Sequence, residues 1–205
     1  MTFSMWRAVT DAGDSAVVGP LVVVTSGVLW AFGSRRGAWL LVRAWLLAGV
    51  GIGTLKVLLL SCGLHWQPGL TSPSGHACMA VVAYGSLAVI FTAGKPLAAR
   101  LLAGALAVLV IGAIAASRIL LGAHTVIEVV VGLEVGVAAF FTFLIPWRED
   151  VAARLDPRAL AVAVFVTAIL LTGTHAPAES YIRHLARKLN GNCGVFLLPE
   201  RANLG

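Results

Sequence analysis

Charged residues are scarce in this sequence, since Asp, Glu, Lys and Arg together make up only 12% of its 205 residues. A soluble domain of this size needs far more polar surface, so the shortage excludes the ordinary soluble globular class. The sequence also lacks any alternation of aromatic and basic residues. We therefore expect no nucleic-acid partner, despite a formal net charge of +6.

Cysteine is rare as well, with three residues and no CxxC pair. Because the cysteines are odd in number and lack paired spacing, cysteine usage is uninformative here. Cys62 and Cys78 both fall near one predicted face of the membrane, so a bond between these two thiols stays open at this stage.

Long apolar runs are what the sequence does contain, and 59% of its residues are hydrophobic. Helices of about 17 to 25 apolar residues cross a bilayer, and they satisfy their own backbone polar groups in lipid. The runs lack the alternating polar period of a membrane barrel. The fold class that we predict is all-α, a polytopic membrane helix bundle with about six transmembrane helices. The expected spans are residues 16–33, 38–62, 76–94, 98–121, 123–146 and 158–175.

Basic residues mark one side of the predicted bundle. They occur in three loops that share that side: Arg35, Arg36, Lys95, Arg100, Arg148, Arg154 and Arg158. The loop between the second and third spans contains no Lys or Arg. The positive-inside rule places the basic loops in the cytoplasm, so both termini and residues 63–75 and 118–124 face outward. We expect a bacterial-type inner membrane protein.

The chain is expected to form a single membrane domain without repeats or linkers. Within residues 1–205, the core is 38–147, an interfacial lead-in is 1–15 and a polar C-terminal tail is 176–205. The tail carries Arg183, Arg187 and Lys188, and we expect it to lie on the membrane surface without a chemical role. No motif sets an oligomeric state.

Ionisable residues inside membrane spans are costly, and several gather near the outward ends of the spans. His124 and Glu128 are four residues apart, which places them on one helix face. The carboxylate can accept a hydrogen bond from one imidazole nitrogen and leave the other free to attack. Gly122 predicts a turn that brings Arg118, whose guanidinium suits phosphate oxygens, to the same pocket. Glu134 lies deeper in the span, and we leave it out of the site.

The run from Pro73 to His76 opens the third span. Ser74 is a good helix cap, and Gly75 allows a ligand to approach the backbone N–H groups at the helix start. His76 is placed to protonate a leaving oxygen. Lys56, in the outer half of the second span, can neutralise phosphate charge.

Lys56, the run Pro73-Ser74-Gly75-His76, and Ser117-Arg118 followed by His124 resemble the three-part signature of the type 2 phosphatidic acid phosphatase superfamily. The resemblance covers about residues 50–135. It implies a metal-independent membrane lipid phosphatase, without a cofactor, that works through a phosphohistidine intermediate. It further implies His124 as nucleophile, Glu128 as its orienting carboxylate and His76 as general acid.

The same resemblance implies that Lys56, Ser74, Gly75 and Arg118 bind the phosphoryl oxygens. Membrane lipids and a lipid phosphate substrate are the expected partners. Polyprenyl pyrophosphate is the first candidate substrate, while phosphatidylglycerol phosphate, phosphatidic acid and a lipid A phosphate stay open.

The sequence departs from the family in two places. Glu128 stands where the family usually has Asp, and no Arg follows Lys56 where the family usually has an Arg-Pro pair. His65 or Gln67 could supply a donor in place of that arginine.

Three other interpretations compete with a lipid phosphatase. A phosphotransferase would pass the phosphoryl group from the same histidine to another lipid, and a non-catalytic protein would only bind or transport a lipid phosphate. His76, His124 and Glu128 could also bind a metal ion, but the neighbouring Arg118 and Lys56 favour an anion instead.

Overall fold

The computed structural model describes residues 3–32, 34–62, 68–147, 157–171, 173–174 and 178–189. Throughout these residues the regular secondary structure is helical, without a strand, which confirms the predicted all-α class. The helices are α1 (Phe3–Asp11), α2 (Ser15–Ala31), α3 (Arg35–Cys62), α4 (Gly75–Phe91), α5 (Leu97–Leu120), α6 (Val126–Leu144), α7 (Pro157–Leu171) and α8 (Ala178–Leu189).

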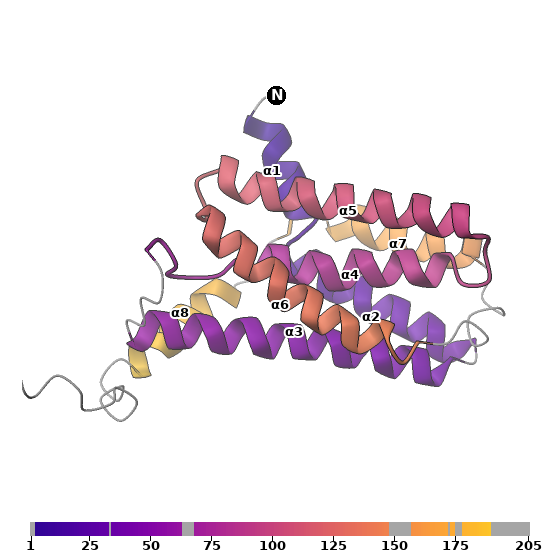
Figure 1. Cartoon of the computed structure of the whole chain (residues 1–205), viewed down its shortest axis with the longest axis horizontal. Coiled ribbons are helices and arrows are strands. Elements are labelled where there is room, and N and C mark those ends of the chain that lie inside the picture. The colour runs from indigo at the N-terminus through magenta and orange to yellow at the C-terminus, as the bar shows by residue number, and fades with distance from the viewer. Residues whose placement is uncertain are drawn as a thin grey trace, which may run out of the picture.

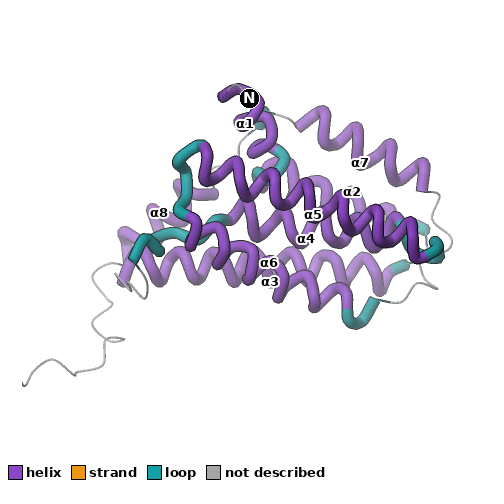
Figure 2. The backbone as a smooth tube through the Cα atoms, turned by 45° about the horizontal axis from the view of Figure 1, so that its top comes forward, coloured by secondary structure: helices purple, strands orange, loops and turns teal. Residues whose placement is uncertain are grey.

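Helix α4 lies at the centre of the bundle. It runs between α5 and α3, and α6 crosses beside it from the end of α5 toward α3 (Figure 1). The contacts agree, because α4 packs against α5 and α6 while α3 packs against α2 and α6. Helix α7 packs on α2, and in Figure 2 it lies along the outside of the bundle. The start of α4 and the junction between α5 and α6 therefore meet at one end of the molecule.

Among the described residues, four helical stretches are long and apolar enough to cross a membrane: Ser4–Ala31, Arg35–Ser61, Leu97–Leu120 and Val126–Leu144. The outer surface is apolar as well, and Leu101 and Val108 on α5 are 64% and 68% exposed. These features identify a membrane protein. Helix α4, with 17 residues, and α7, with 15, are shorter, so the count of six spans stays a prediction.

Glycines let α6 approach α4 closely. A Cβ atom on Gly132 would overlap the carbonyl oxygen of Ser74, and one on Gly136 would lie 2.6 Å from the carbonyl oxygen of Cys78. The close approach is the one expected for small residues four apart in membrane helices. It presses the first turn of α4 against the second turn of α6.

Cys78 is a free thiol, fully buried in α4. The side chain of Cys62, with which the sequence left a bond open, lies outside the described residues. Burial among the aliphatic side chains of α2, α3 and α4 explains why Cys78 is present, since a free thiol packs as a small hydrophobic group.

Candidate active site

The turn between α5 and α6 carries His124. Helix α5 ends at Leu120, and Gly122 takes a φ of +67°, a left-handed value that glycine adopts without strain. Thr125 then caps α6, so His124 precedes this helix instead of lying within it. Its Nδ1 atom is nevertheless 3.0 Å from Oε2 of Glu128, in the first turn of α6.

Both carboxylate oxygens of Glu128 accept hydrogen bonds. Oε1 accepts hydrogen bonds from the backbone N–H of Thr71 at 2.9 Å, from the Thr71 hydroxyl at 2.7 Å and from the backbone N–H of Ser72 at 2.7 Å. Oε2 accepts from the backbone N–H of Thr125 at 3.1 Å. A carboxylate surrounded by donors acts as an acceptor toward His124 Nδ1 as well. The proton of the imidazole therefore lies on Nδ1, and Nε2 keeps its lone pair.

His124 is held in its neutral form by its surroundings. Burial lowers its pKa, the hydrogen bond to Glu128 opposes this shift, and the positive charges of Lys56 and Arg118 lower the pKa further. The side chain is only 10% exposed. A neutral imidazole with one fixed N–H is the state that a nucleophilic histidine requires.

The first turn of α4 carries His76, the second histidine of the predicted site. Ser74 caps α4 by accepting a hydrogen bond from the backbone N–H of Ala77 at 3.4 Å. His76, one quarter exposed, has its Nε2 atom 3.6 Å from Oδ2 of Asp14. Asp14 in turn caps α2 through the backbone N–H of Ala16 at 2.8 Å. His76 is therefore oriented by a carboxylate that belongs to a different helix.

Two cationic side chains from α3 and α5 complete this part of the site. Lys56 is 3% exposed and forms an ion pair with Glu179 of α8. Arg118 donates from one terminal nitrogen to the Thr10 hydroxyl at 2.9 Å. Its Nε atom is buried and has no acceptor among the described residues. The guanidinium of Arg118 therefore supplies positive charge to this part of the site, where it can attract an anion.

One cavity of about 530 Å³ collects these groups. Its lining includes Lys56, Gly75, His76, Arg118 and His124 from the predicted site. The other two predicted residues lie behind this lining, because Glu128 supports His124 and the fully buried Ser74 caps α4. The structure thus brings together residues that are far apart in the sequence.

The cavity also contains residues that the sequence analysis left without a role. Asp14, Glu179 and Arg183 line it, and Thr71 and Ser72 support Glu128 from outside. The spacing of Glu179 and Arg183 by four residues was the available signal, because such a pair shares one helix face. The prediction of a tail without chemistry misses this face, since α8 folds back against α3.

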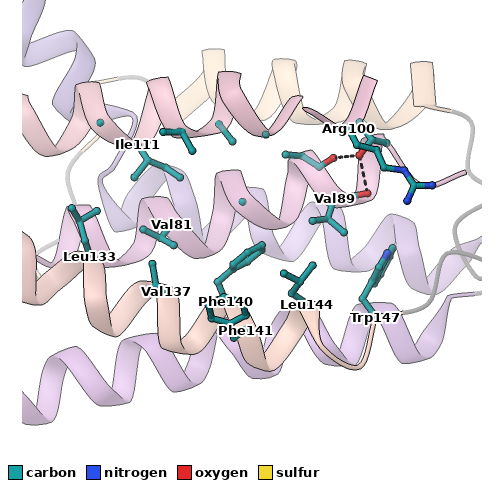
Figure 3. A pocket seen from close by; sticks show the side chains of 17 residues that line it. Val81, Val89, Arg100, Ile111, Leu133, Val137, Phe140, Phe141, Leu144 and Trp147 are labelled. Atoms are coloured by element: carbon teal, nitrogen blue, oxygen red, sulfur yellow. Dashed lines mark hydrogen bonds between the residues drawn. The ribbon is translucent and has the colours of Figure 1, made fainter. Parts of the chain in front are cut away.

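A larger hollow of about 830 Å³ lies elsewhere, between α4, α5 and α6. Figure 3 shows its apolar lining, which includes Ile111, Leu133, Val137 and Phe140. Arg100 lies at its far end, near the start of α5. Apolar side chains of this kind suit a lipid chain and offer no catalytic group, so the smaller polar cavity is the candidate active site.

Within the described residues, no group of three or more His, Cys, Asp and Glu side chains is placed to hold a metal ion. His124 and Glu128 are in contact, whereas His76 lies beside Asp14. His65 and Gln67, the two suggested replacements for the missing arginine, lie outside the described residues.

The fold and the site together define a helical membrane protein with a histidine–carboxylate pair at a cationic cavity. The family model of the PAP2 superfamily matches residues 56–152, so this part of the chain is similar to that superfamily, in agreement with the resemblance seen in the sequence. All of the predicted site residues, from Lys56 to Glu128, fall in the matched stretch. Members of the superfamily are phosphatases, and the match therefore supports a hydrolase of phosphoric esters at a general level. No curated protein and no solved structure matches the chain significantly.

Proposed function

We propose that this protein removes a phosphate group from a membrane lipid through a phosphohistidine on Nε2 of His124. The observation that carries the proposal is the hydrogen bond between His124 Nδ1 and Glu128 Oε2 at 3.0 Å. It leaves the second ring nitrogen free at a cavity that Lys56 and Arg118 make attractive to phosphate.

In the first step, Nε2 of His124 attacks the phosphorus atom, and the bond from phosphorus to the leaving oxygen breaks. His76 donates a proton to that oxygen as it leaves. Lys56 and Arg118 neutralise the charge on the phosphoryl oxygens, and the backbone N–H groups at the start of α4 add further donors. The carboxylate of Glu128 stabilises the positive charge that develops on His124.

In the second step, water attacks the phosphohistidine and the phosphorus–nitrogen bond breaks. His76, now neutral, accepts a proton from the attacking water, and inorganic phosphate leaves the site. His76 thereby returns to the form in which it began. No group besides the residues described here and water is required for this sequence of steps.

The substrate is proposed to be a phosphomonoester or a diphosphate of a lipid, with polyprenyl pyrophosphate as the first candidate. The site is proposed to face outward. Support comes from the arrangement of the bundle: the starts of α3 and α5 lie at the end opposite to the end of α3 and the junction of α5 and α6 (Figure 1). Arg35 and Arg100 lie in the first turns of α3 and α5, whereas Lys56 and His124 lie near the end of α3 and at the junction. The lipid chain would stay in the bilayer while its head group enters the cavity.

Phosphate release by the detergent-purified protein tests this proposal directly. A panel of polyprenyl pyrophosphate and phospholipid phosphates is assayed in EDTA, with wild type beside His124→Ala. His184→Ala serves as the matched control, because His184 is exposed on α8 and does not line the cavity. Release that survives EDTA and disappears only in His124→Ala supports a metal-independent histidine phosphatase.

Two other results contradict the proposal. Loss of activity in EDTA, with recovery on adding a metal ion, would replace the phosphohistidine with metal-dependent hydrolysis. Phosphate that appears on a second lipid, and not in solution, would identify a phosphotransferase.

A further inference from the structure

Helix α8 covers one side of the candidate active site, although it lies outside the stretch matched by the family model. It packs against α3 (Figure 1). Glu179, Ile182 and Arg183 line the cavity, while Ala186 is buried. These positions follow the spacing of one helix face, so a single face of α8 forms part of the cavity.

The carboxylate of Glu179 connects two cations. Its Oε2 atom forms an ion pair with Nζ of Lys56, and its Oε1 atom accepts a hydrogen bond from Nε of Arg183 at 3.2 Å. Burial raises the pKa of Glu179, but the hydrogen bonds and positive charges of Lys56 and Arg183 outweigh it, so that the pKa is lowered. Glu179 is therefore ionised, and it serves as the counter-charge of Lys56.

A buried ammonium group requires an anion next to it. In this structure Glu179 supplies that anion from α8, across 123 positions of sequence. A phosphate bound in front of His124 would offer its own oxygens to Lys56, and it would repel the Glu179 carboxylate. Phosphate and Glu179 therefore compete for the same ammonium group.

Arg183 has the geometry of a phosphate ligand. Its bond to Glu179 uses only Nε, one part of a guanidinium that carries five N–H donors. The side chain is 64% exposed, which places it at the rim where a head group would enter. Guanidinium groups bind phosphate oxygens in pairs, so Arg183 can hold a phosphate that has displaced Glu179 from Lys56.

We propose that Arg183 is a substrate-binding residue, which holds the lipid phosphate together with Lys56 and Arg118, and that Glu179 occupies Lys56 only while the site is free of phosphate. The inference rests on the proposed function, since it concerns the same cavity. It assigns to α8 both a ligand for the substrate and a group that the substrate displaces.

Binding of inorganic phosphate, measured by titration calorimetry in a His124→Ala background, tests the inference without turnover. Arg183→Ala is expected to raise the Kd for phosphate about tenfold, the effect of losing one charge-assisted contact. Arg183→Lys is expected to recover part of the loss. Glu179→Gln is expected to act in the opposite direction and to lower the Kd several-fold, because the competing carboxylate is gone.

Arg187→Ala is the matched control, since Arg187 lies on the same helix but does not line the cavity. It removes the same charge, so an equal effect of Arg183→Ala and Arg187→Ala would overturn the inference. Absence of phosphate binding in the parent protein, or weaker binding in Glu179→Gln, would also overturn it.

Lipid phosphate hydrolysis separates this inference from the proposed function. In the protein with His124 intact, Arg183→Ala is expected to raise KM with little change in kcat. If Arg183→Ala hydrolyses the lipid with an unchanged KM, the role of Arg183 is rejected and the proposed phosphatase activity is kept. Phosphate binding that depends on Arg183, in a protein that hydrolyses no lipid, would keep the inference and reject the phosphatase.

Discussion

The backbone N–H of Ser74 donates a hydrogen bond to the backbone carbonyl of Glu128 at 2.9 Å. This bond joins the segment that carries His76 to the helix that supports His124. The Thr71 and Ser72 donors to the Glu128 side chain reinforce the same junction. Contacts to the backbone and side chain of Glu128 therefore hold the start of α4 against the start of α6.

Replacing Glu128 by Gln should lower kcat by about a hundredfold or more, because the neutral amide neither fixes the His124 tautomer nor stabilises the charge on the ring. The amide NH₂ would also face the donors of Thr71 or His124. Glu128→Asp keeps the charge and should retain more activity. The measurement is kcat for lipid phosphate release.

Glu134→Gln provides the control for this prediction. Glu134 lies on the same helix and is exposed, outside the lining of the cavity. The prediction is wrong when Glu128→Gln and Glu134→Gln keep similar kcat values.

Two glycine substitutions should separate binding from stability. At Gly75 a new Cβ would have Lys56 Cε, at 3.9 Å, as its nearest neighbour, so the fold can accept Ala. The methyl group would project toward the cavity and weaken phosphate binding at the start of α4. Gly75→Ala should raise KM severalfold while the thermal unfolding temperature stays close to that of wild type.

Gly132→Ala should behave in the opposite way, because its Cβ would overlap the carbonyl oxygen of Ser74. Moving α4 away from α6 costs about 1 to 3 kcal/mol, the usual cost of overpacking. Thermal unfolding in detergent should show the loss. Equal stability of the two variants would contradict the packing described for this junction.

The pH dependence of kcat/KM should reflect the lowered pKa of His124. The nucleophile must be neutral, so activity is lost as pH falls through the pKa of this histidine in the folded protein. Burial, Lys56 and Arg118 place that pKa below the ordinary value of 6.5, while Glu128 opposes the shift. Activity should therefore persist below pH 6.5 before it declines.

Lys56→Met should move this acidic limb to higher pH, because it removes a positive charge that disfavours the imidazolium. The profile is measured on the residual activity of the variant. An acidic limb that stays in place, or that moves to lower pH, would show that Lys56 does not act on His124.

The sequence was sufficient to predict the helical membrane fold and the gathering of Lys56, His76, Arg118 and His124, because each of these costly groups falls near the same end of an apolar run. Gly122 also predicted the turn that brings Arg118 back toward His124. These features depend on local spacing and on the direction of each helix.

Other parts of the site depend on contacts that local spacing does not encode. The donors to Glu128 from Thr71 and Ser72 include backbone N–H groups, which every residue type except proline carries. The amphipathic pattern of α8 fits the membrane surface as well as a protein surface, and only the pairing of Glu179 with the distant Lys56 places it at the cavity.

The roles of His76 and Asp14 should be visible when substrates with poor and good leaving groups are compared. An aliphatic alkoxide needs a proton as it departs, whereas a nitrophenolate does not. His76→Ala should therefore reduce kcat/KM, which covers only the steps up to the phosphohistidine, by about a hundredfold or more for a lipid phosphomonoester and much less for an aryl phosphate with a good leaving group.

Asp14→Asn should also reduce activity more on the lipid phosphomonoester than on the aryl phosphate, but with smaller losses. Asn preserves the cap of α2, as Asp and Asn are similarly good cap residues, but it removes the charge 3.6 Å from His76 Nε2. The fold should therefore be kept while the orientation of His76 is disturbed. Values of kcat/KM for both substrates, measured in parallel for wild type and the two variants, test the assignment. Equal losses on both substrates would mean that these residues act in phosphate binding or in structure, and that another group protonates the leaving oxygen.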